Sequence, residues 1–280
     1  MRDNSVMTYS LIILGSGQDG GSPQVGTESS AGLARSASSI AVTSDEGTVL
    51  LFDVSPDIRS QYKRLAAHCG YAPPLDGVFV THGHMGHYAG LVHFGKEAAS
   101  TSGLPLFAPS SVLEFLEENE PWATLISGEH LRPISIDDAT ATVDRITVSA
   151  VHVPHRAEFT ATVGYSIAID DNPWVFYLPD IDGWDEWPEA EEVFTRHDVC
   201  LIDATFSSMD ELPGRDIAAI KHPLVPDTIV RFQHLTPDHT MILTHINHSN
   251  RLGVPDADIT TLAHELGFTI AHDGLVINHD

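Results

Sequence analysis

The chain has 280 residues, of which 42% are hydrophobic and 19% charged, a composition typical of globular proteins rather than disordered or membrane-spanning ones. Its 14 Lys and Arg against 39 Asp and Glu give a formal net charge of −25. This charge disfavours binding to polyanions, so we expect no nucleic acid partner. No apolar run approaches the ~18 residues of a membrane span. Cys69 and Cys200 form no paired-thiol motif, which is typical of a reducing compartment. We therefore expect a soluble, cytoplasmic protein without a membrane partner; the sequence does not indicate its oligomeric state.

Strands and helices are predicted in mixed order along the chain. Runs of β-branched residues predict strands, and apolar residues at three- and four-residue spacing predict helices. No linker or repeat divides the sequence, so we expect one domain over residues 1–280. In chain order the expected elements are strands 9–14, 39–43 and 48–54, helix 56–70, strand 77–81, helices 88–99 and 110–119, strands 146–153, 162–169, 174–178 and 199–203, helix 226–234, strand 241–244, helix 257–266 and strand 275–278.

A glycine-rich segment follows the first predicted strand. Gly15-Ser-Gly17-Gln-Asp-Gly20 matches the dinucleotide-binding pattern G-x-G-x-x-G, which must open a helix whose N-terminus holds the pyrophosphate. Here Gly21, Pro23 and Gly26 follow, and these residues are typical of a loop. We therefore expect a glycine loop that borders an active site, with close backbone approach to a ligand, and no nucleotide site.

Three histidines follow the predicted strand 77–81 within a six-residue segment. Residues i and i+2 at a strand end point the same way, so His82 and His84 can converge on one metal ion. Gly83 and Gly86 let the loop fold back and deliver His87. Neutral imidazole is a common ligand of zinc, iron, copper and nickel. The segment therefore predicts a transition-metal centre.

This segment resembles the H-x-H-x-D-H signature of the metallo-β-lactamase superfamily, although Gly86 stands where the signature has Asp. Three later segments are similar to the remaining ligand motifs of that superfamily, in the same order: Val153-Pro-His155-Arg156, Tyr177-Leu-Pro-Asp180 and Leu243-Thr-His245. The resemblance covers nearly the whole chain. It implies an α/β fold, the four-layer αβ/βα sandwich with its metal ions at one edge.

The resemblance also implies one or two divalent metal ions, with zinc preferred and iron or manganese possible. A carboxylate that bridges two ions holds them close together, and a water between them loses a proton near neutral pH. The resulting metal-bound hydroxide would attack the substrate. The implied ligands are His82, His84 and His155 for the first ion, and His87, Asp180 and His245 for the second, with Asp180 bridging.

Gly86 leaves the second group of ligands one carboxylate short. Fewer anionic donors weaken the binding of a cation. We therefore expect the second ion to bind weakly, or its site to be completed by His248 or Asp182.

Two of the implied ligands have rivals nearby in the sequence. His152 could replace His155, but its place within an apolar strand favours a core or supporting role. Asp203 also ends an apolar strand and could replace Asp180. We favour Asp180 as the ligand, with Asp203 orienting a ligand histidine.

Two further residues could contact the substrate. His222 could protonate the leaving oxygen, because imidazole titrates near neutral pH, or it could be a structural histidine. Arg156, next to His155, could bind an anion or form a salt bridge.

Finer likenesses point to two branches of the superfamily. Asp203-Ala-Thr-Phe206 and His222 are similar to the phosphodiesterases, which include transfer-RNA 3′-processing nucleases. Leu14-Gly-Ser, Gly20-Gly-Ser-Pro-Gln24 and Asn247-His-Ser-Asn250 resemble the pyrroloquinoline quinone biosynthesis B proteins, the closer likeness overall. We predict a metallo-hydrolase acting on a small phosphodiester or ester. The alternatives are an iron-dependent oxidative enzyme and a non-catalytic protein that binds a metal or ligand.

Overall fold

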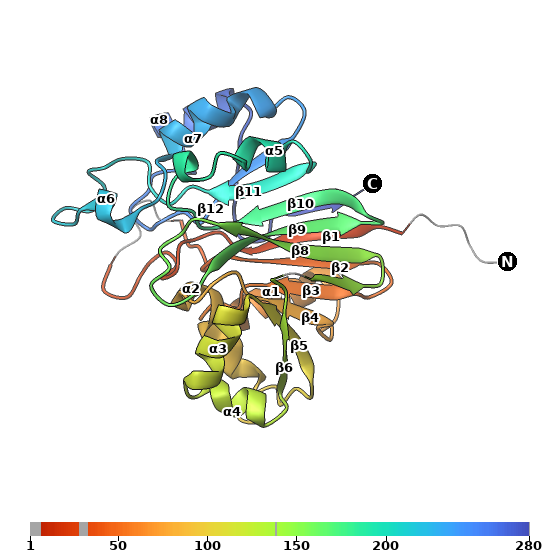
Figure 1. Cartoon of the computed structure of the whole chain (residues 1–280). Coiled ribbons are helices and arrows are strands. Elements are labelled where there is room, and N and C mark those ends of the chain that lie inside the picture. The colour runs from red at the N-terminus through yellow and green to blue at the C-terminus, as the bar shows by residue number, and fades with distance from the viewer. Residues whose placement is uncertain (1–6, 28–32, 138, 280) are drawn as a thin grey trace.

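Two seven-stranded sheets lie face to face in the computed structural model, which describes residues 7–27, 33–137 and 139–279 (Figure 1). The first sheet has the strand order β14-β1-β2-β3-β4-β5-β6. The pairings β14–β1, β1–β2 and β2–β3 are antiparallel, and β3 to β6 run parallel. The bounds are β1 Tyr9–Gly15, β2 Ser39–Ser44, β3 Val49–Phe52, β4 Gly77–Phe79, β5 Leu104–Ala108, β6 Leu131–Ser135 and β14 Val276–His279.

The second sheet has the strand order β13-β12-β11-β10-β9-β8-β7. Strands β10 to β13 run parallel, and β7 to β10 form an antiparallel meander. The bounds are β7 Thr140–Val143, β8 Ile146–Val153, β9 Thr162–Ile169, β10 Asn172–Leu178, β11 Val199–Asp203, β12 Thr240–Thr244 and β13 Thr269–Ile270.

Helices cover the outer face of each sheet (Figure 1). Leu65, Leu116 and Leu125 from three helices pack on the first sheet, and Phe194 and Phe232 pack on the second. The layers are therefore helix, sheet, sheet and helix, which confirms the expected four-layer αβ/βα sandwich. The helices are α1 Ile58–Cys69, α3 Ser110–Glu118 and α4 Trp122–Ser127 on the first sheet, and α5 Ala190–Phe194, α7 Val225–Phe232 and α8 Asp258–Glu265 on the second; shorter pieces are α2 Met85–Tyr88, η1 Ala89–Phe94, η2 Trp184–Glu186, α6 Ile217–Ile220 and η3 Gln233–Leu235.

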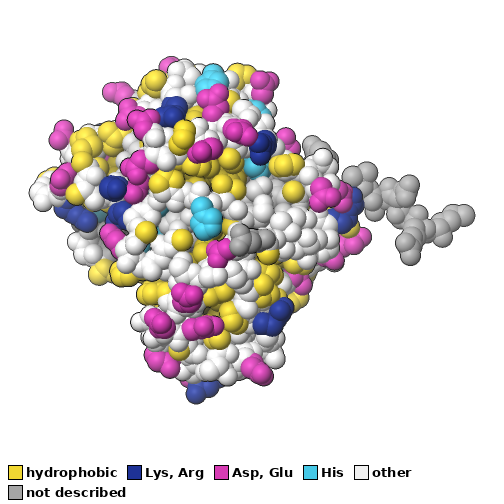
Figure 2. Space-filling view, viewed as in Figure 1, with side chains coloured by type: hydrophobic (Ala, Val, Ile, Leu, Met, Phe, Trp, Pro, Cys, Tyr) yellow, Lys and Arg dark blue, Asp and Glu magenta, His cyan; other side chains and the backbone are white. Residues whose placement is uncertain are grey.

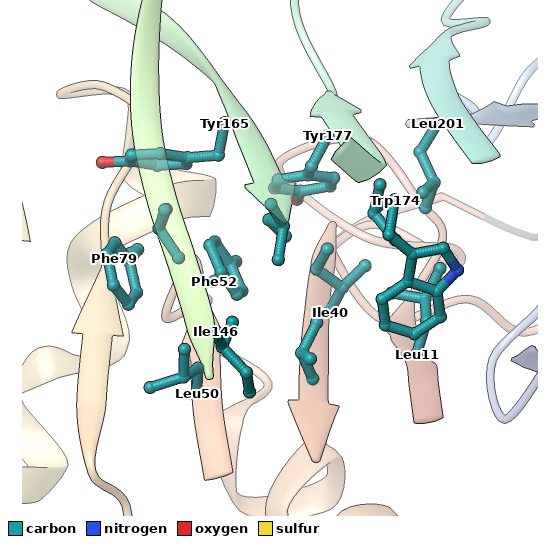
Figure 3. Packing of buried hydrophobic residues seen from close by; sticks show 14 of the residues in the cluster. Leu11, Ile40, Leu50, Phe52, Phe79, Ile146, Tyr165, Trp174, Tyr177 and Leu201 are labelled. Carbon is teal, nitrogen blue, oxygen red and sulfur yellow. The ribbon is translucent and has the colours of Figure 1, made fainter. Parts of the chain in front are cut away.

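Aromatic side chains from both sheets fill the space between them (Figure 3). The ring of Phe79 stacks on that of Phe52 with centroids 4.7 Å apart, and Tyr165 meets Phe79 edge to face. Truncation of such a buried ring to alanine costs about 3–5 kcal/mol. The hydroxyl of Tyr165 donates to the carbonyl of Val80, and that of Tyr177 donates to Asp53. The core is thereby tied to Val80, which precedes the histidine loop, and to Asp53, which follows β3.

The prediction of one helix over residues 88–99 is wrong in both its bounds and its type. The chain instead forms the single turn α2 and the 3₁₀ segment η1, which ends at Phe94. Gly90 approaches the backbone so closely that a Cβ there would lie 2.1 Å from the carbonyl oxygen of Ser55.

Strands β5 and β6 were not expected, because Pro105 and Pro133 interrupt their pattern, and proline is rare within sheets.

Acidic side chains are scattered over the face seen in Figure 2, and basic ones occur there only in small groups. That face therefore carries no continuous basic stripe of the kind that binds phosphate backbones. Within the described residues, no helix has the length and apolar character needed to cross a membrane.

Candidate metal centre

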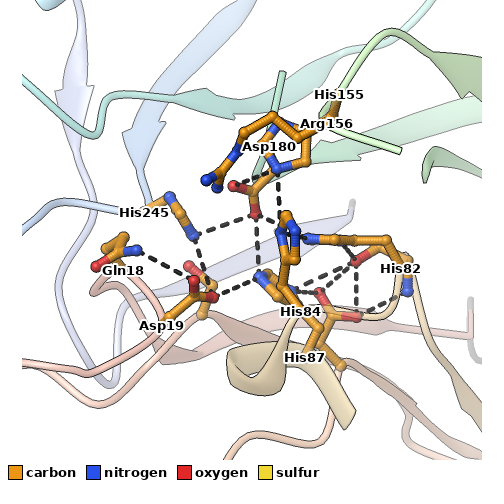
Figure 4. Close-up of polar contacts among 12 residues, drawn as sticks. Gln18, Asp19, His82, His84, His87, His155, Arg156, Asp180 and His245 are labelled. Carbon is orange, nitrogen blue, oxygen red and sulfur yellow. Dashed lines mark hydrogen bonds and ion pairs between the residues drawn. The ribbon is translucent and has the colours of Figure 1, made fainter. Parts of the chain in front are cut away.

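Imidazoles and carboxylates from both sheets meet at one edge of the sandwich (Figure 4). The histidine loop follows β4 of the first sheet, and Asp180 follows β10 of the second. His155 and His245 come directly after β8 and β12. Parallel strands end at a common edge of a sheet, where ligand sites of α/β folds collect. The fold therefore brings these sequence-distant residues together.

The first group consists of His82, His84 and His155, all buried. Nδ1 of His84 lies 2.9 Å from Nε2 of His82 and 3.2 Å from Nε2 of His155. The loop is fixed by the amide of Gly83, which donates to the Thr160 hydroxyl at 2.8 Å. Three ring nitrogens thus converge on one point, as ligands of a single cation would.

The second group is centred on Asp180, which is 2% exposed. Its Oδ2 lies 3.0 Å from Nε2 of His87 and 3.1 Å from Nε2 of His245. Its Oδ1 lies 3.5 Å from Nε2 of His155 in the first group. The two oxygens of one carboxylate therefore face the two histidine groups, which is the arrangement expected of a bridging ligand.

Asp53, a fully buried carboxylate at the end of β3, orients the histidine loop. Its Oδ2 lies 2.7 Å from Nδ1 of His87 and accepts a hydrogen bond from Tyr177. Its Oδ1 accepts the amide of Thr81 at 2.9 Å. A carboxylate on one ring nitrogen leaves the other free to bind a metal and fixes the ring plane. Asp53 was not foreseen from the sequence.

Asp203 has the orienting role that we expected for it. Its Oδ2 lies 2.6 Å from Nδ1 of His222, and its Oδ1 accepts the hydroxyl of Thr205 at 2.7 Å. That hydroxyl lies 2.8 Å from Nδ1 of His245. Asp203 therefore supports two histidines, and Asp180 faces both groups. Ligand atoms of Asp180, Asp203, His222 and His245 also lie close enough together to hold an ion.

The environment favours the protonation states that metal ligands need at Asp180 and His155, but it opposes the neutral form of His87. Burial opposes ionisation of Asp180, but His245, His155 and His87 outweigh it and hold the pKa of the carboxyl well below its usual value. Burial lowers the pKa of His155 to about 4. Burial also lowers the pKa of His87, but Asp53 and Asp180 outweigh it and raise that pKa well above its usual value. His87 must therefore release a proton before it binds a cation.

Several buried polar atoms in the cluster have no hydrogen-bond partner among the residues that the structure describes. They include Oδ2 of Asp180, Nε2 of His87, Nε2 of His245 and Oδ1 of Asp19. An unpaired buried polar atom is costly, so it calls for an unseen partner such as an ion. Nitrogen and oxygen donors without thiolate suit zinc, iron or manganese. The residues present therefore fit a divalent metal centre.

The glycine loop after β1 borders this centre, as expected, and it adds a carboxylate that sequence analysis missed. Oδ1 of Asp19 lies 3.2 Å from Nε2 of His87 and 4.0 Å from Nε2 of His245. Asp19, His87 and His245 form a further group whose ligand atoms could hold an ion.

Residues 48–246 match the family described as the beta-lactamase superfamily domain. The chain belongs to this superfamily. Over 96% of its length it is 26% identical to coenzyme PQQ synthesis protein B of Cupriavidus necator, and the match covers 99% of that protein. The expected likeness to the pyrroloquinoline quinone biosynthesis B proteins is therefore confirmed.

Solved structures of the superfamily share the fold. Zinc-bound PqqB from Methylobacterium extorquens superposes with a TM-score of 0.78 at 22% identity, covering 96% of this chain and 99% of that one. A diphosphatase of the PhnP family gives a TM-score of 0.72 at 22% identity, covering 98% of each chain. The expectation that the chain is an enzyme of the metallo-β-lactamase superfamily is confirmed at the level of the family.

The structure brings all the implied ligands into the cluster, but it places some rivals elsewhere. The side chain of His152 is 56% exposed, with Nε2 3.9 Å from Asp137. It is therefore neither a ligand nor a core residue, because side chains alternate along a strand and its ring points away from the buried Val153. The residues brought together are His82, His84, His87, His155, Asp180 and His245, with His222 beside them.

Completion of the second group by His248 or Asp182 is wrong. Oδ1 of Asp182 lies 3.1 Å from Nδ1 of His155, on the outer side of that ring, and its Oδ2 pairs with Lys221. Nδ1 of His248 lies 3.0 Å from the side-chain oxygen of Asn247. Among the described residues, no group of close ligand atoms includes either of them.

Arg156 forms no salt bridge within the described part of the chain, so that alternative is wrong for it. Its backbone amide donates to Asp182 at 2.9 Å, whereas its Nε is buried without a hydrogen-bond partner. Figure 4 shows the side chain of Arg156 next to His155 and Asp180. The guanidinium of Arg156, which pairs with no carboxylate of the described residues, thus lies beside the candidate metal centre.

Proposed function

We propose that the protein is a metal-dependent hydrolase that acts on a small phosphodiester or ester, with the phosphodiester favoured. The observation that carries this proposal is the position of Asp180. One of its oxygens lies 3.5 Å from His155, and the other lies 3.0 Å from His87 and 3.1 Å from His245. Such a shared carboxylate suits two cations held close together.

Divalent cations bound there would lower the pKa of water and stabilise negative charge on the substrate. The side chains of this chain do the positioning. Asp53 and Thr205 hold the rings of His87 and His245 through Nδ1, so that each Nε2 faces Asp180. Preorganised donors of this kind need no rearrangement during the reaction.

His222 is suited to protonate the leaving oxygen. Burial lowers its pKa, but Asp203, bonded to Nδ1, and Asp180 outweigh burial and raise that pKa above its usual value. Because Asp203 holds Nδ1, the other ring nitrogen, Nε2, is available for proton transfer; it is buried and has no hydrogen-bond partner among the described residues. A protonated imidazole directed at the reacting group is an effective general acid.

Arg156 favours an anionic substrate over a neutral ester. Its Nε is buried without a partner beside the first histidine group, and the guanidinium geometry matches phosphate oxygens. The ring of Phe159, 62% exposed, lies 6.2 Å from that of His84 and offers apolar contact to an organic substituent. The formal charge of −25 disfavours long polyanions, so we propose a small diester and no nucleic acid partner.

The relatives supply a second candidate. Proteins named for coenzyme PQQ synthesis match nearly the whole chain, and a donor set without thiolate accepts iron as readily as zinc. Cys69 and Cys200 lie outside the groups of potential ligands that the described residues form. An iron-dependent oxidation at the same ligands is therefore the alternative to hydrolysis.

The test combines metal analysis with paired substrates. Protein purified without a histidine tag is analysed by plasma mass spectrometry and then assayed with bis(p-nitrophenyl) phosphate and p-nitrophenyl acetate, with and without a chelator. We expect one to two equivalents of zinc or manganese and chelator-sensitive hydrolysis, faster for the phosphate. Bound iron with oxygen uptake would support the oxidative candidate. A metal-loaded protein inert towards both esters and oxygen would favour a non-catalytic binding protein.

A further inference from the structure

Gly86 occupies the position at which the H-x-H-x-D-H signature carries its aspartate. The structure places another carboxylate against it, because Asp19 of the glycine loop reaches the same histidines. We propose that Asp19 supplies the carboxylate ligand of the second metal ion that Gly86 cannot supply. This inference rests on the proposed metal-dependent function and specifies how the second group is completed.

Asp19 and a side chain at position 86 exclude one another. A Cβ on Gly86 would lie 2.3 Å from Oδ1 of Asp19 and 2.5 Å from its Cα. Non-bonded carbon and oxygen atoms do not approach so closely, so any side chain at position 86 would displace the glycine loop. The glycine in the histidine segment is therefore what gives Asp19 its place.

The two oxygens of Asp19 have different surroundings. Oδ2 accepts a hydrogen bond from Nε2 of Gln18 at 3.1 Å. Oδ1 is buried and has no hydrogen-bond partner, and it faces Nε2 of His87 at 3.2 Å (Figure 4). One oxygen thus orients the carboxylate, and the other points to the space that it shares with His87, His245 and Asp180. This is how a monodentate ligand is presented to a cation.

Backbone hydrogen bonds hold the glycine loop beside β12. The amide of Gln18 donates to the carbonyl of Ile246 at 3.1 Å, and the amide of Ile246 donates to Ser16 at 2.9 Å. The amide of Gly17 donates to Ser36 at 2.8 Å. Asp19 is therefore positioned by the strand end that also carries His245, and the carboxylate needs no large movement to bind an ion.

With Asp19, the second group has two carboxylates, each of which faces both His87 and His245, one carboxylate more than sequence analysis assigned to it. Anionic oxygen ligands strengthen the binding of a divalent cation. The second site should then bind its ion tightly, in contrast to the weak binding expected from Gly86 alone.

The test is a calorimetric titration of the metal-free protein with Zn²⁺, with Co²⁺ absorption as a second readout that does not depend on activity. The variants are Asp19→Asn, Asp182→Asn as a matched control near the first group, and His87→Ala as a positive control. We expect two equivalents in the natural protein. Asp19→Asn should bind the first equivalent of Zn²⁺ as tightly as the natural protein. Its affinity for the second equivalent should fall at least about tenfold, since even the loss of a residue that supports a ligand has that effect. Asp182→Asn should bind the second equivalent with unchanged affinity.

Each other outcome overturns the proposal. If Asp19→Asn binds both ions as tightly as the natural protein while His87→Ala loses one, Asp19 is not a ligand. If the natural protein binds a single ion that Asp19→Asn leaves unchanged, the inference fails but the proposed hydrolase function survives. If the natural protein binds no ion, both fail. Circular dichroism checks folding, and Asp19→Ser replaces the Asn variant if that variant does not fold.

Discussion

The two halves of the metal centre are built in different ways. The first takes His82 and His84 from one loop and adds His155, so two segments complete it. The second combines His87, His245, Asp180 and Asp19, which come from four segments on both sheets. In the first half, the histidine loop alone fixes two of the three ligands relative to one another. A half that is distributed depends on the packing of the whole sandwich.

The halves also differ in how their rings are held. His87 is fixed through Nδ1 by the buried Asp53, and His245 by Thr205, which Asp203 holds in turn. In the first half, Nδ1 of His82 lies 3.0 Å from the hydroxyl of Thr81, and Nδ1 of His155 lies 3.1 Å from Oδ1 of Asp182. Carboxylate partners make an imidazole a stronger ligand. Each half therefore has one ring on a carboxylate and one on a hydroxyl, but Asp53 of the second half is fully buried, whereas Asp182 also pairs with the exposed Lys221.

Loss of the first half should have the largest effect. In His82→Ala/His84→Ala only His155 remains of the first group, so no chelating set of ligands is left for that ion. We expect the loss of at least one metal equivalent and a fall in turnover of about a thousandfold or more, because the metal supplies most of the rate enhancement. Plasma mass spectrometry and chelator-controlled kinetics measure both. His93→Ala, at a histidine outside the cluster, is the control. Unchanged metal content in the double variant would contradict the whole assignment.

His222 lies next to both halves, and a substitution there distinguishes a proton donor from a metal ligand. His222→Ala should lower turnover by about a hundredfold, in the range for loss of a general acid. The metal content should stay at the natural value. The loss should be smaller for substrates with better leaving groups, because these need less protonation. If the variant instead loses a metal equivalent, His222 is a ligand together with Asp180 and His245, and the proton-donor role is wrong.

Arg156 lies next to the first half, and its loss should slow the hydrolysis of anionic substrates only. A hydrogen bond to a charged group contributes about 1.5–3 kcal/mol, so Arg156→Met should lower kcat/KM for a phosphodiester by about tenfold or more. Hydrolysis of p-nitrophenyl acetate should stay unchanged, and it is the internal control. Arg156→Lys should recover part of the phosphodiester activity. Equal losses on both esters would mean that Arg156 supports the site rather than binds the substrate.

Local signals in the sequence predicted most strands and the histidine loop. Runs of β-branched residues and turn residues predicted the strands, and the histidine loop after an apolar strand predicted the metal centre. Neither signal depends on how the two sheets pack. The four-layer fold and the part of His155 in the first half followed from the resemblance to the superfamily. The helix over 88–99 failed because the approach of Gly90 to Ser55 is a tertiary contact, which periodicity does not report.

The second half was foreseen only in part for the same reason. Asp19 lies in a segment that matched a nucleotide-binding pattern, and Gly86 lies 67 positions further along the chain. The pairing of β1 to β4 in one sheet and the hydrogen bonds from the loop to Ile246 bring the two together. Asp53 likewise looked like a residue within the expected strand 48–54. A signal was present in hindsight: an aspartate in a glycine loop at the site, and a glycine where the signature has aspartate.

Gly86→Asp should have the smallest of these effects, a change in stability and in binding of the second ion, and its direction is opposite to what the signature suggests. The substitution restores the aspartate of H-x-H-x-D-H, but its Cβ would lie 2.5 Å from Cα of Asp19, in a loop that is bonded to Ile246. We expect a stability loss of about 1–3 kcal/mol from overpacking and weaker binding of the second ion, measured by chemical denaturation and calorimetry. In Asp19→Gly/Gly86→Asp the competing carboxylate is gone, so part of the binding should return. If Gly86→Asp is as stable as the natural protein and binds the second ion more tightly, the glycine loop can move aside at little cost. The carboxylate of the second half could then come from position 19 or from position 86 equally well.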